Sequence, residues 1–334
     1  MADVGLREVA ARAKVSVATV SNVLNRPERV TARTIDRVMK VVEELGYVPN
    51  VAARQLKSGR SNVLGMAVLN ITNPFFAQVV LGAEEIAEKA GYSVIVGNSY
   101  DSPSRESRYL ELFEQQRLDG VLLAPVSDDL SGLDPFARRG VPVVLVDRVD
   151  PRGLFVSVSV DDVRGGQLAT EHIVATGARH IAFVGGPWSV AQMRDRLEGC
   201  RQVAHARAVR LSEYQTGPLN ARIGREIGDQ IAQMPAEERP DGIFAANDEA
   251  ALGILQSLVM HSIAVPKEIV IVGFDDIDLA ASAIVPLTSV SQPANMMGVR
   301  AAELLLAGIL APDQARASVR FEPELVARQS TRRG

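Results

Sequence analysis

The sequence contains a single cysteine, Cys200, among 334 residues. An intramolecular disulfide is therefore impossible, and we expect Cys200 to be a small buried hydrophobe in a reducing compartment. The four histidines show no metal-ligand spacing, so we expect no metal site. No apolar run approaches the roughly 18 residues of a membrane helix, and the N-terminus has no secretory-signal pattern. These absences predict a cytoplasmic protein without membrane contact.

Sequence motifs of nucleotide-dependent and hydrolytic enzymes are also missing. The sequence has no Gly-x-Gly-x-x-Gly after a strand, no Gly-x-x-x-x-Gly-Lys-Ser/Thr loop and no Gly-x-Ser-x-Gly elbow. The Asp and His residues form no plausible triad by spacing. We therefore expect neither an enzyme nor a cofactor.

The net charge of −4 hides an uneven distribution of charge along the chain. Residues 1–60 hold 11 Lys and Arg against 6 Asp and Glu, whereas the remaining residues hold 25 against 34. A basic N-terminal part on an acidic remainder is typical of a small DNA-binding head attached to a larger core.

The basic part begins with a pattern for two crossed helices. Apolar residues that would face inward recur at helical spacing, namely Leu6, Val9, Ala10 and Ala13, then Val20, Val23 and Leu24, with Val15 in the turn. Ser16 is expected to cap the second helix. The opposite face of that helix carries Val17, Ala18, Ser21 and Asn22, which are small or polar groups suited to meeting base edges. The pattern predicts a helix-turn-helix.

A third helix is predicted from the capping residue Thr31 to a stop at Gly46. Pro49 breaks it, and the short segment 51–58 would be a marginal helix when isolated. We predict a DNA-binding head over residues 1–48, a hinge or linker over 49–60 and a core over 61–334.

The core sequence alternates between apolar strands and amphipathic helices. The strand candidates are 63–69, 93–97, 120–124, 141–146, 155–160, 181–184, 242–245 and 269–273. Such a pattern predicts parallel sheets covered by helices on both faces, and there are too many strands for one compact sheet. We predict two doubly wound α/β lobes, lobe 1 over about 61–161 and 292–320, and lobe 2 over about 162–290 and 321–334. Residues 317–328 form the last strand-like segment.

Six strings carry a resemblance to a known family. They are Val15-Ser-Val-Ala-Thr-Val-Ser21, Leu45-Gly-Tyr-Val-Pro-Asn50 with Ala53-Arg-Gln-Leu56, Thr72-Asn-Pro-Phe-Phe76, Arg196-Leu-Glu-Gly199, Ala246-Asn-Asp248 and Val272-Gly-Phe-Asp-Asp276. In this order and spacing the whole chain closely resembles the lac-repressor (LacI/GalR) family of bacterial transcription regulators. The resemblance implies an all-α head, a periplasmic-binding-protein-like core, a nucleoid-associated location and repression of carbohydrate-utilisation genes.

The resemblance also implies roles in DNA binding. Val17 and Ala18 would enter the major groove with Ser21 and Asn22 alongside, while Ser16 and Thr19 would contact phosphate. Asn25 and Ala53 complete this set, and Leu56 would wedge into the minor groove and bend the duplex. Asn22 departs from the Arg common in the family, and an Asn–adenine pair is a natural alternative. Lys14 stands where the family commonly has Gly or Asn, and a lysine would be mildly strained if this position is left-handed.

In a two-lobed α/β core, ligands bind outside the carboxyl ends of the strands. The candidate effector residues at such ends are Asn70, Phe75, Phe76, Asp147, Arg148, Arg196, Asn247, Asp275 and Gln292. This mixture of aromatic, charged and amide groups suits a polyhydroxylated ring. The resemblance points to Arg196 and Asp275 as the principal hydroxyl anchors. The alternative roles of the polar residues are inter-lobe salt bridges and helix caps. Phe75 and Phe76 are not expected to face the cleft equally, since one of them can pack under the first helix of the lobe.

The ligand and the assembly are left partly open. A purine, a nucleoside or a protein co-regulator could replace the sugar, although a total of 15 aromatic residues slightly favours a sugar. A sugar-binding protein without a regulatory role is a remote alternative. Trp188 could cover the ligand or lie at the surface. We expect a homodimer that reads a pseudo-palindromic operator, and no C-terminal heptad helix remains to form a tetramer.

Overall fold

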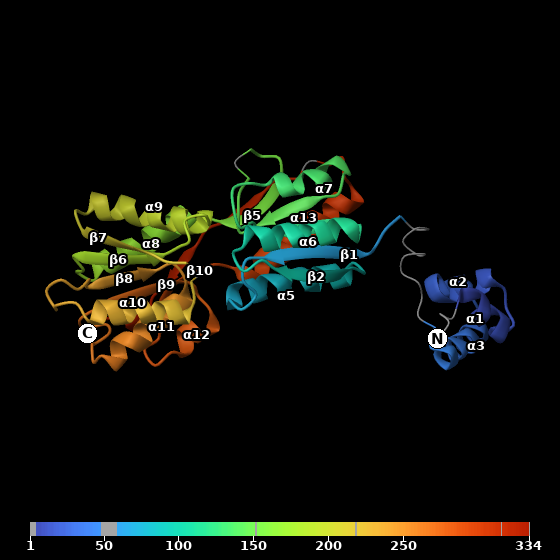
Figure 1. Cartoon of the computed structure of the whole chain (residues 1–334), viewed down its shortest axis with the longest axis horizontal. Helices are drawn as coiled ribbons and strands as arrows, with labels where there is room; N and C mark the ends of the chain where they lie inside the picture. Colours follow the sequence, from blue (N-terminus) through green and yellow to red (C-terminus); the bar gives the residue numbers. More distant parts are fainter. Residues whose placement is uncertain (1–4, 48–58, 151, 218, 315, 334) are drawn as a thin grey trace. The chain divides into compact units, whose positions relative to one another are not determined.

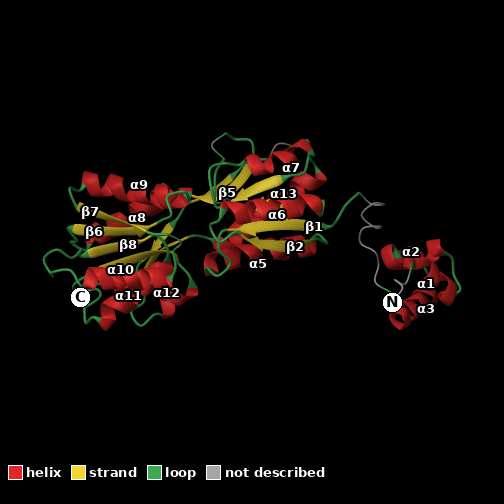
Figure 2. Ribbon diagram, in the orientation of Figure 1, coloured by secondary structure: helices red, strands yellow, loops and turns green. Residues whose placement is uncertain are grey.

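The computed structural model describes residues 5–47, 59–150, 152–217, 219–314 and 316–333. The chain divides into two compact units, 1–61 and 62–334, whose helices and strands are shown in Figures 1 and 2. No helix in these described ranges is both long and apolar enough to cross a membrane.

The first unit is a small three-helix head. It consists of α1 (Leu6–Ala13), α2 (Val17–Asn25), a 3-10 turn (Pro27–Arg29) and α3 (Ala32–Leu45). Its core is formed by the buried residues Val9, Ala10, Ala13, Val20, Val23, Val38, Val41 and Tyr47. The inward faces predicted for the first two helices are therefore confirmed, and α3 buries Val38 and Val41.

The helix ends of the head show local stereochemistry that the sequence predicts. The Ser16 side chain accepts a hydrogen bond from the Thr19 amide at 3.0 Å, so it caps α2 as expected. Lys14 ends α1 in the left-handed region with φ 53°, and Gly46 ends α3 at φ 58°. The prediction for Thr31 was wrong in detail. It occupies the N-cap position of α3, but its hydroxyl bonds the Thr34 hydroxyl at 3.0 Å rather than a backbone amide.

The second unit contains two six-stranded sheets, each the centre of one lobe. In lobe 1 the order is β11-β5-β4-β3-β1-β2, and all neighbouring strands are parallel. The strands are β1 (Val63–Val68), β2 (Ser93–Asn98), β3 (Gly120–Leu123), β4 (Val143–Val146), β5 (Val156–Val160) and β11 (Val319–Phe321). The helices are α5 (Pro74–Lys89), α6 (Pro103–Gln115), α7 (Asp134–Arg138) and α13 (Ala294–Leu310). Separate hydrophobic clusters on the α5–α13 and α6–α7 sides bury both faces of the sheet.

In lobe 2 the order is β12-β10-β9-β8-β6-β7, parallel except for the β10–β12 pair. The strands are β6 (His180–Gly185), β7 (Arg210–Gln215), β8 (Gly242–Ala245), β9 (Val270–Asp275), β10 (Thr288–Ser291) and β12 (Glu324–Val326). The helices are α8 (Asp162–Ala175), α9 (Ala191–Ala206), α10 (Ala221–Ala232), α11 (Asp248–Met260) and α12 (Asp278–Ser282). Figure 1 shows α8 and α9 on one side of this sheet and α10 and α11 on the other.

The chain passes between the lobes three times, after β5, after β10 and between β11 and β12. The segment 317–328, expected as one strand, is instead two three-residue strands, one in each sheet. Because the strands of each lobe are mainly parallel, the loops that follow β1, β4, β8 and β9 meet at the junction of the lobes. The candidate site lies there.

Candidate functional site

The head presents its second helix to solvent. Val17 is 41% exposed, and Ala18 and Asn22 are also exposed on α2. At the start of the helix the hydroxyls of Ser16 and Thr19 lie 2.9 Å apart. The structure thus places small and polar groups on the accessible face of α2, as a recognition helix requires.

Four other residues were predicted to bind DNA, and the structure fully describes only Ser21 among them. Ser21 is half-buried on α2, and Asn25 is the last residue of that helix, but its side chain lies outside the described part. Ala53 and Leu56 lie outside the described residues, so their roles stay predictions.

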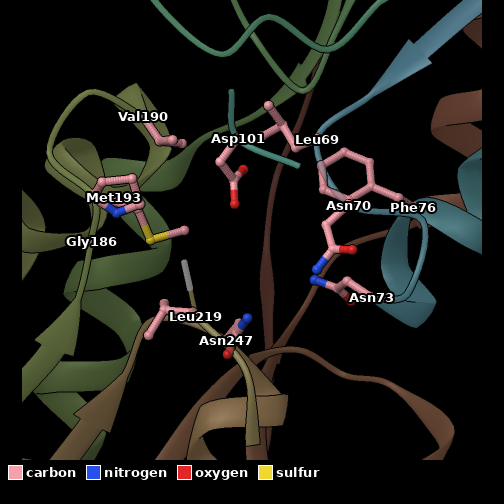
Figure 3. Close-up of a pocket in the computed structure, with 11 residues that line it drawn as sticks. Leu69, Asn70, Asn73, Phe76, Asp101, Gly186, Val190, Met193, Leu219 and Asn247 are labelled. Carbon is pink, nitrogen blue, oxygen red and sulfur yellow. The ribbon is translucent and has the colours of Figure 1, made fainter. Parts of the chain in front are cut away.

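A cleft lies between the two lobes. Residues from both lobes line it, and Figure 3 shows their side chains around one space. Lobe 1 contributes Leu69, Asn70, Asn73, Phe76 and Asp101, and lobe 2 contributes Gly186, Pro187, Val190, Met193, Leu219 and Asn247. A ligand in this cleft would contact both lobes at once, which is the geometry needed to couple binding to their relative position.

Three predicted effector residues belong to this lining. Asn70, Phe76 and Asn247 face the cleft, and the Asn247 side chain also caps α11 by accepting a hydrogen bond from the Ala250 amide at 2.9 Å. Phe75 does not line the cleft. It is 3% exposed in the lobe 1 core, with its ring edge-on to Phe76 at 5.0 Å between centroids. Of the two adjacent aromatic rings, the second is the one available to a ligand.

Arg196 lies beneath the lining and is 3% exposed. Its Nε donates to Asp162 at 2.7 Å and its Nη1 donates to the Ala246 carbonyl at 2.6 Å. The guanidinium carbon also lies 3.6 Å from the centroid of the Phe274 ring. These contacts hold the side chain in place from three directions, so Arg196 organises lobe 2 rather than extending freely into the cleft.

Close packing of two helices brings Arg196 to these partners. A Cβ atom on Gly166 of α8 would lie 2.2 Å from the Arg196 carbonyl oxygen. A larger residue would push α9 away from α8, and Asp162 at the start of α8 would lose its contact with Arg196.

Asp275 connects the lobes at the end of β9. Its carboxylate accepts hydrogen bonds from the Asn73 amide at 3.1 Å and from the Gln292 amide at 2.7 Å, and it lies 3.8 Å from Arg196 Nη1. Asn73 begins α5 in lobe 1, where its side-chain oxygen accepts from the Phe75 amide at 2.9 Å. The predicted residues Arg196, Asp275 and Gln292 are therefore brought together, with Asn73 as an additional member.

Asp147 makes a second connection between the lobes. Gln192 of α9 donates to one Asp147 carboxyl oxygen at 3.0 Å and also to the Asp147 backbone carbonyl. The other carboxyl oxygen, Oδ1, is buried and has no hydrogen-bond partner within the part of the chain that the structure describes. Burial, with repulsion from Asp162, raises the pKa of Asp147 to about 8. Burial similarly raises the pKa of Asp162 to about 6 against the opposing effect of Arg196.

Arg148 points away from this group. It pairs with Asp128, which also accepts from Arg194 of α9 at 2.8 Å. Arg148 thus contributes to an inter-lobe ion-pair cluster at the surface and does not line the cleft. For this residue the alternative role, an inter-lobe salt bridge, matches the observed contacts.

Trp188 and Asp161 also lie near the junction. Trp188 is half-buried against the lobe 2 core, 6.2 Å between ring centroids from Phe183, and it does not line the cleft. Asp161 caps α8 through the Arg164 amide at 2.9 Å and pairs with Arg320. Its role is structural.

Sequence reasoning missed several residues of the site, among them Asn73, Asp101, Asp162 and Gln192. Asn73 lies inside the string Thr72–Phe76, where the resemblance itself was a signal. Asp101 follows β2, and burial raises the pKa of its carboxyl to about 6. Gln192 begins a helix of lobe 2, and nothing in its local sequence indicates a partner 45 residues away.

Comparison with protein families gives two matches. Residues 5–50 match the family described as bacterial regulatory proteins, lacI family, and residues 170–331 match a periplasmic binding protein-like domain. The first match covers the helix-turn-helix head, and the second covers most of lobe 2 and the return through lobe 1.

Whole-chain relatives agree with these matches. The chain is 31% identical to the ribose operon repressor of Escherichia coli strain K12, covering 97% of this chain and 99% of the relative. It is also 31% identical to the HTH-type transcriptional repressor PurR of Photobacterium profundum, over 98% of both chains. A solved structure of the lac repressor dimer bound to operator and the anti-inducer ONPF is 28% identical, covers 99% of both chains and has a TM-score of 0.83. These relatives are repressors and not enzymes.

Proposed function

The chain belongs to the lacI family of bacterial regulatory proteins, and we propose that it represses carbohydrate-utilisation genes as a homodimer whose operator binding is switched by a small sugar between the lobes. The observation that carries the proposal is a cleft lined from both lobes in a chain whose head exposes a recognition helix. The alternatives of a purine or nucleoside effector, and of a protein co-regulator, keep the same DNA-binding role.

The DNA-reading part of the proposal rests on α2. Val17, Ala18 and Asn22 are exposed on this helix, where they would meet base edges in the major groove. We propose that Ser21 and Asn25 lie alongside, and that Ser16 and Thr19 contact a phosphate. An Asn side chain can pair with both the N6 and N7 positions of adenine.

The test of this part is selection of a binding site from random DNA by the full-length protein, followed by Asn22→Ala. The variant should lose about 1–3 kcal/mol at one base pair in each half-site and tolerate other bases there. Met39→Ala on α3, where Met39 is 45% exposed, is the matched control and should leave the preference unchanged. An Asn22→Ala protein with an unaltered preference at every position would contradict the assignment.

We propose that Ala53 and Leu56 act in the linker, with Leu56 inserted between base pairs at the centre of the operator. An apolar wedge requires a deformable step, so Leu56→Ala should weaken operator binding far more than binding to random DNA. Competition titrations with both DNAs measure the difference. Equal losses on the two DNAs would remove the wedge from the proposal.

The effector part rests on the chemistry of the cleft. Phe76 supplies one aromatic face, and three asparagines, Asn70, Asn73 and Asn247, supply amide groups around it. A sugar ring has one C–H face for an aromatic contact and hydroxyls at its edge for amides. A purine is better held between two aromatic faces, and the described lining has one aromatic side chain. This composition favours the sugar.

A thermal-shift screen of the full-length protein against free sugars, sugar alcohols, nucleosides and purines tests the class. A ligand at about 100 times its dissociation constant adds roughly 2.7 kcal/mol to the stability of the folded state. Stabilisation by a purine alone would replace the sugar in the proposal, and the same compound should alter operator affinity.

The homodimer rests on exposed apolar side chains of the core. In lobe 1 they include Leu81 of α5 with Ile95 and Val96 of the edge strand β2, and in lobe 2 they include Met260 of α11, Leu279 of α12 and Ile284. Figure 1 shows these helices and β2 along the same, lower side of both lobes. Exposed apolar side chains on these elements are suited to contact with a second copy of the chain.

Light scattering with size-exclusion chromatography tests the assembly. Leu81→Asp should give a monomer that binds one half-site weakly, because a charge would be buried at the centre of the contact. Glu85→Asp, an exposed change on the same helix, is the control. A Leu81→Asp protein that remains dimeric would place the interface elsewhere.

A further inference from the structure

The charge of the inter-lobe cleft is one-sided. Its described lining includes one ionisable side chain, Asp101, and no Lys, Arg or His. Figure 3 shows the Asp101 carboxylate pointing into the space between the lobes, on the opposite side from Asn247. A ligand in the cleft therefore meets a carboxylate and amides, and no cation in the lining that could neutralise an anionic group.

Three arginines described at the lobe junction are engaged with other groups. Arg196 is hydrogen-bonded to Asp162 and the Ala246 carbonyl and lies over the Phe274 ring. Arg148 and Arg194 share the carboxylate of Asp128. Freeing any of them for a phosphate or carboxylate would expose a buried or paired acid, which is unfavourable.

The buried polar atoms without partners are mostly oxygens of this junction. Asp147 Oδ1, Gln192 Oε1 and Gln292 Oε1 are all buried and lack a hydrogen-bond partner among the described residues. Their residues are 3–5% exposed and lie beside the residues that line the cleft, where Gln292 donates to Asp275 and Asp147 faces Arg196. The two glutamine oxygens accept hydrogen bonds only, so a group that reaches them must be a donor. Hydroxyl groups supply donors, whereas phosphate and carboxylate groups at neutral pH bring almost only acceptors.

We propose that the effector is an uncharged polyhydroxylated compound, a free sugar or sugar alcohol, and that the cleft rejects phosphorylated and carboxylated sugars, with Asp101 as a specificity-determining contact. This inference rests on the proposed function of the same cleft. Asp101 accepts from a ligand hydroxyl and repels an anion at the same position. An anionic group placed against a carboxylate at a desolvated contact costs several kcal/mol of binding free energy relative to a neutral group. This cost corresponds to an affinity about 100-fold or more lower for the anionic ligand.

The experiment is calorimetric titration of the full-length protein with matched compounds. The neutral set is D-ribose, D-xylose, D-glucose, D-galactose, D-fructose, D-mannitol, maltose and cellobiose, and the anionic set is the phosphates and aldonic or uronic acids of the same sugars. We expect a neutral compound to bind at least about 100-fold more tightly than its phosphate or acid. Tighter binding of any anionic compound, or no binding by any neutral compound, would overturn the proposal.

Operator binding by the same preparation is measured in parallel, so the two proposals fail separately. A protein that selects a DNA site but binds only a sugar phosphate refutes the inference and retains the regulatory function. A protein that binds a neutral sugar but selects no DNA site refutes the regulatory function and retains the ligand class.

Asp101→Asn tests the proposed contact. Asp101 has φ 54°, a left-handed conformation that asparagine tolerates, so the exchange removes the charge and keeps the backbone. Affinity for the neutral ligand should fall about tenfold or more, since a hydrogen bond to a charged group is lost. The difference in affinity between the neutral compound and its phosphate or acid should become smaller. The exposed Asp313→Asn is the control and should change neither. Unchanged affinities and an unchanged gap in Asp101→Asn would remove Asp101 from the proposal.

Discussion

Replacing Arg196 should reveal how much of the lobe 2 structure depends on one buried cation. Arg196→Ala removes the hydrogen bonds to Asp162 at 2.7 Å and to the Ala246 carbonyl at 2.6 Å, together with the contact over Phe274. It leaves Asp162 and Asp275 buried without the guanidinium that lowers the pKa of both. Removing one partner of a buried pair costs about 3–5 kcal/mol. We expect a loss of that size in the free energy of unfolding at pH 7.

The same helix offers a matched control. Arg201 pairs with Glu213 through two hydrogen bonds of 2.7 Å, but the two side chains are 52% and 33% exposed. Such exposed pairs contribute about 0.2–1 kcal/mol. Arg201→Ala should therefore cost at most about 1 kcal/mol, although it removes the same side chain and a comparable ion pair.

Urea unfolding followed by tryptophan fluorescence measures the loss of unfolding free energy of both variants in lobe 2, where both substitutions lie. The chain has one tryptophan, and Trp188 packs on the lobe 2 core. Equal losses for the two variants would refute the reasoning that burial makes Arg196 the more important residue. In the Arg196→Ala background, Asp162→Asn should recover part of the lost stability because it removes an unpaired buried charge.

The loss should also depend on pH. Without Arg196 the folded-state pKa of Asp162 rises further above its ordinary value of 3.8. A carboxyl whose pKa is raised in the folded state loses stability as the pH rises through the interval between the two values. The difference between Arg196→Ala and the parent should therefore be smallest near pH 4, where the lost contacts to Ala246 and Phe274 remain, and should grow toward pH 8. A difference that shrinks as the pH rises would contradict this account.

Three further predictions concern single residues. Burial raises the pKa of Asp147 to about 8, so the unfolding free energy of the parent should fall between about pH 4 and pH 8, and Asp147→Asn should flatten that decline; identical pH profiles would contradict it. Lys14→Gly should raise the melting temperature of the head in calorimetry, because glycine relieves about 1 kcal/mol at φ 53°, whereas Ala11→Gly inside α1 should lower it. Burial raises the pKa of the Cys200 thiol to about 12, so a thiol reagent at pH 8 should modify Cys200 only after unfolding; rapid modification of the native protein would refute this.

Local structure of the head could be predicted because its causes are local. The Ser16 side chain and the Thr19 amide are three residues apart, so a capping pattern in the sequence contains both partners. Gly46 at a left-handed helix end is likewise a property of one residue. Most central strands of the core could also be predicted, since strands buried on both faces are mainly apolar. The strand β10 (Thr288–Ser291) is the exception, because it lies between β9 and β12 but has a single apolar residue.

The edge strand β2 was predicted, but β7, β11 and β12, which also lie at sheet edges, were missed or merged into one segment because they carry no continuous apolar run. The strand β7 (Arg210–Gln215) lies at the edge of the lobe 2 sheet and has no residue that is fully buried. Its sequence therefore lacks a continuous apolar run. The strands β11 and β12 have three residues each, too few to show a period. Their assignment to different sheets depends on where the chain crosses between lobes.

The sequence by itself determined most helices and strands of this protein, its family and some of the residues that meet at the lobe junction. Only the tertiary structure decided which of them a ligand can reach. Phe75 and Phe76 are neighbours in sequence, yet the start of α5 turns one into the core and the other toward the cleft. Arg148 turns to Asp128, and Gln192 meets Asp147 from the other lobe. A side chain's partner across such distances depends on how two separately folded sheets dock, and no local pattern encodes that arrangement.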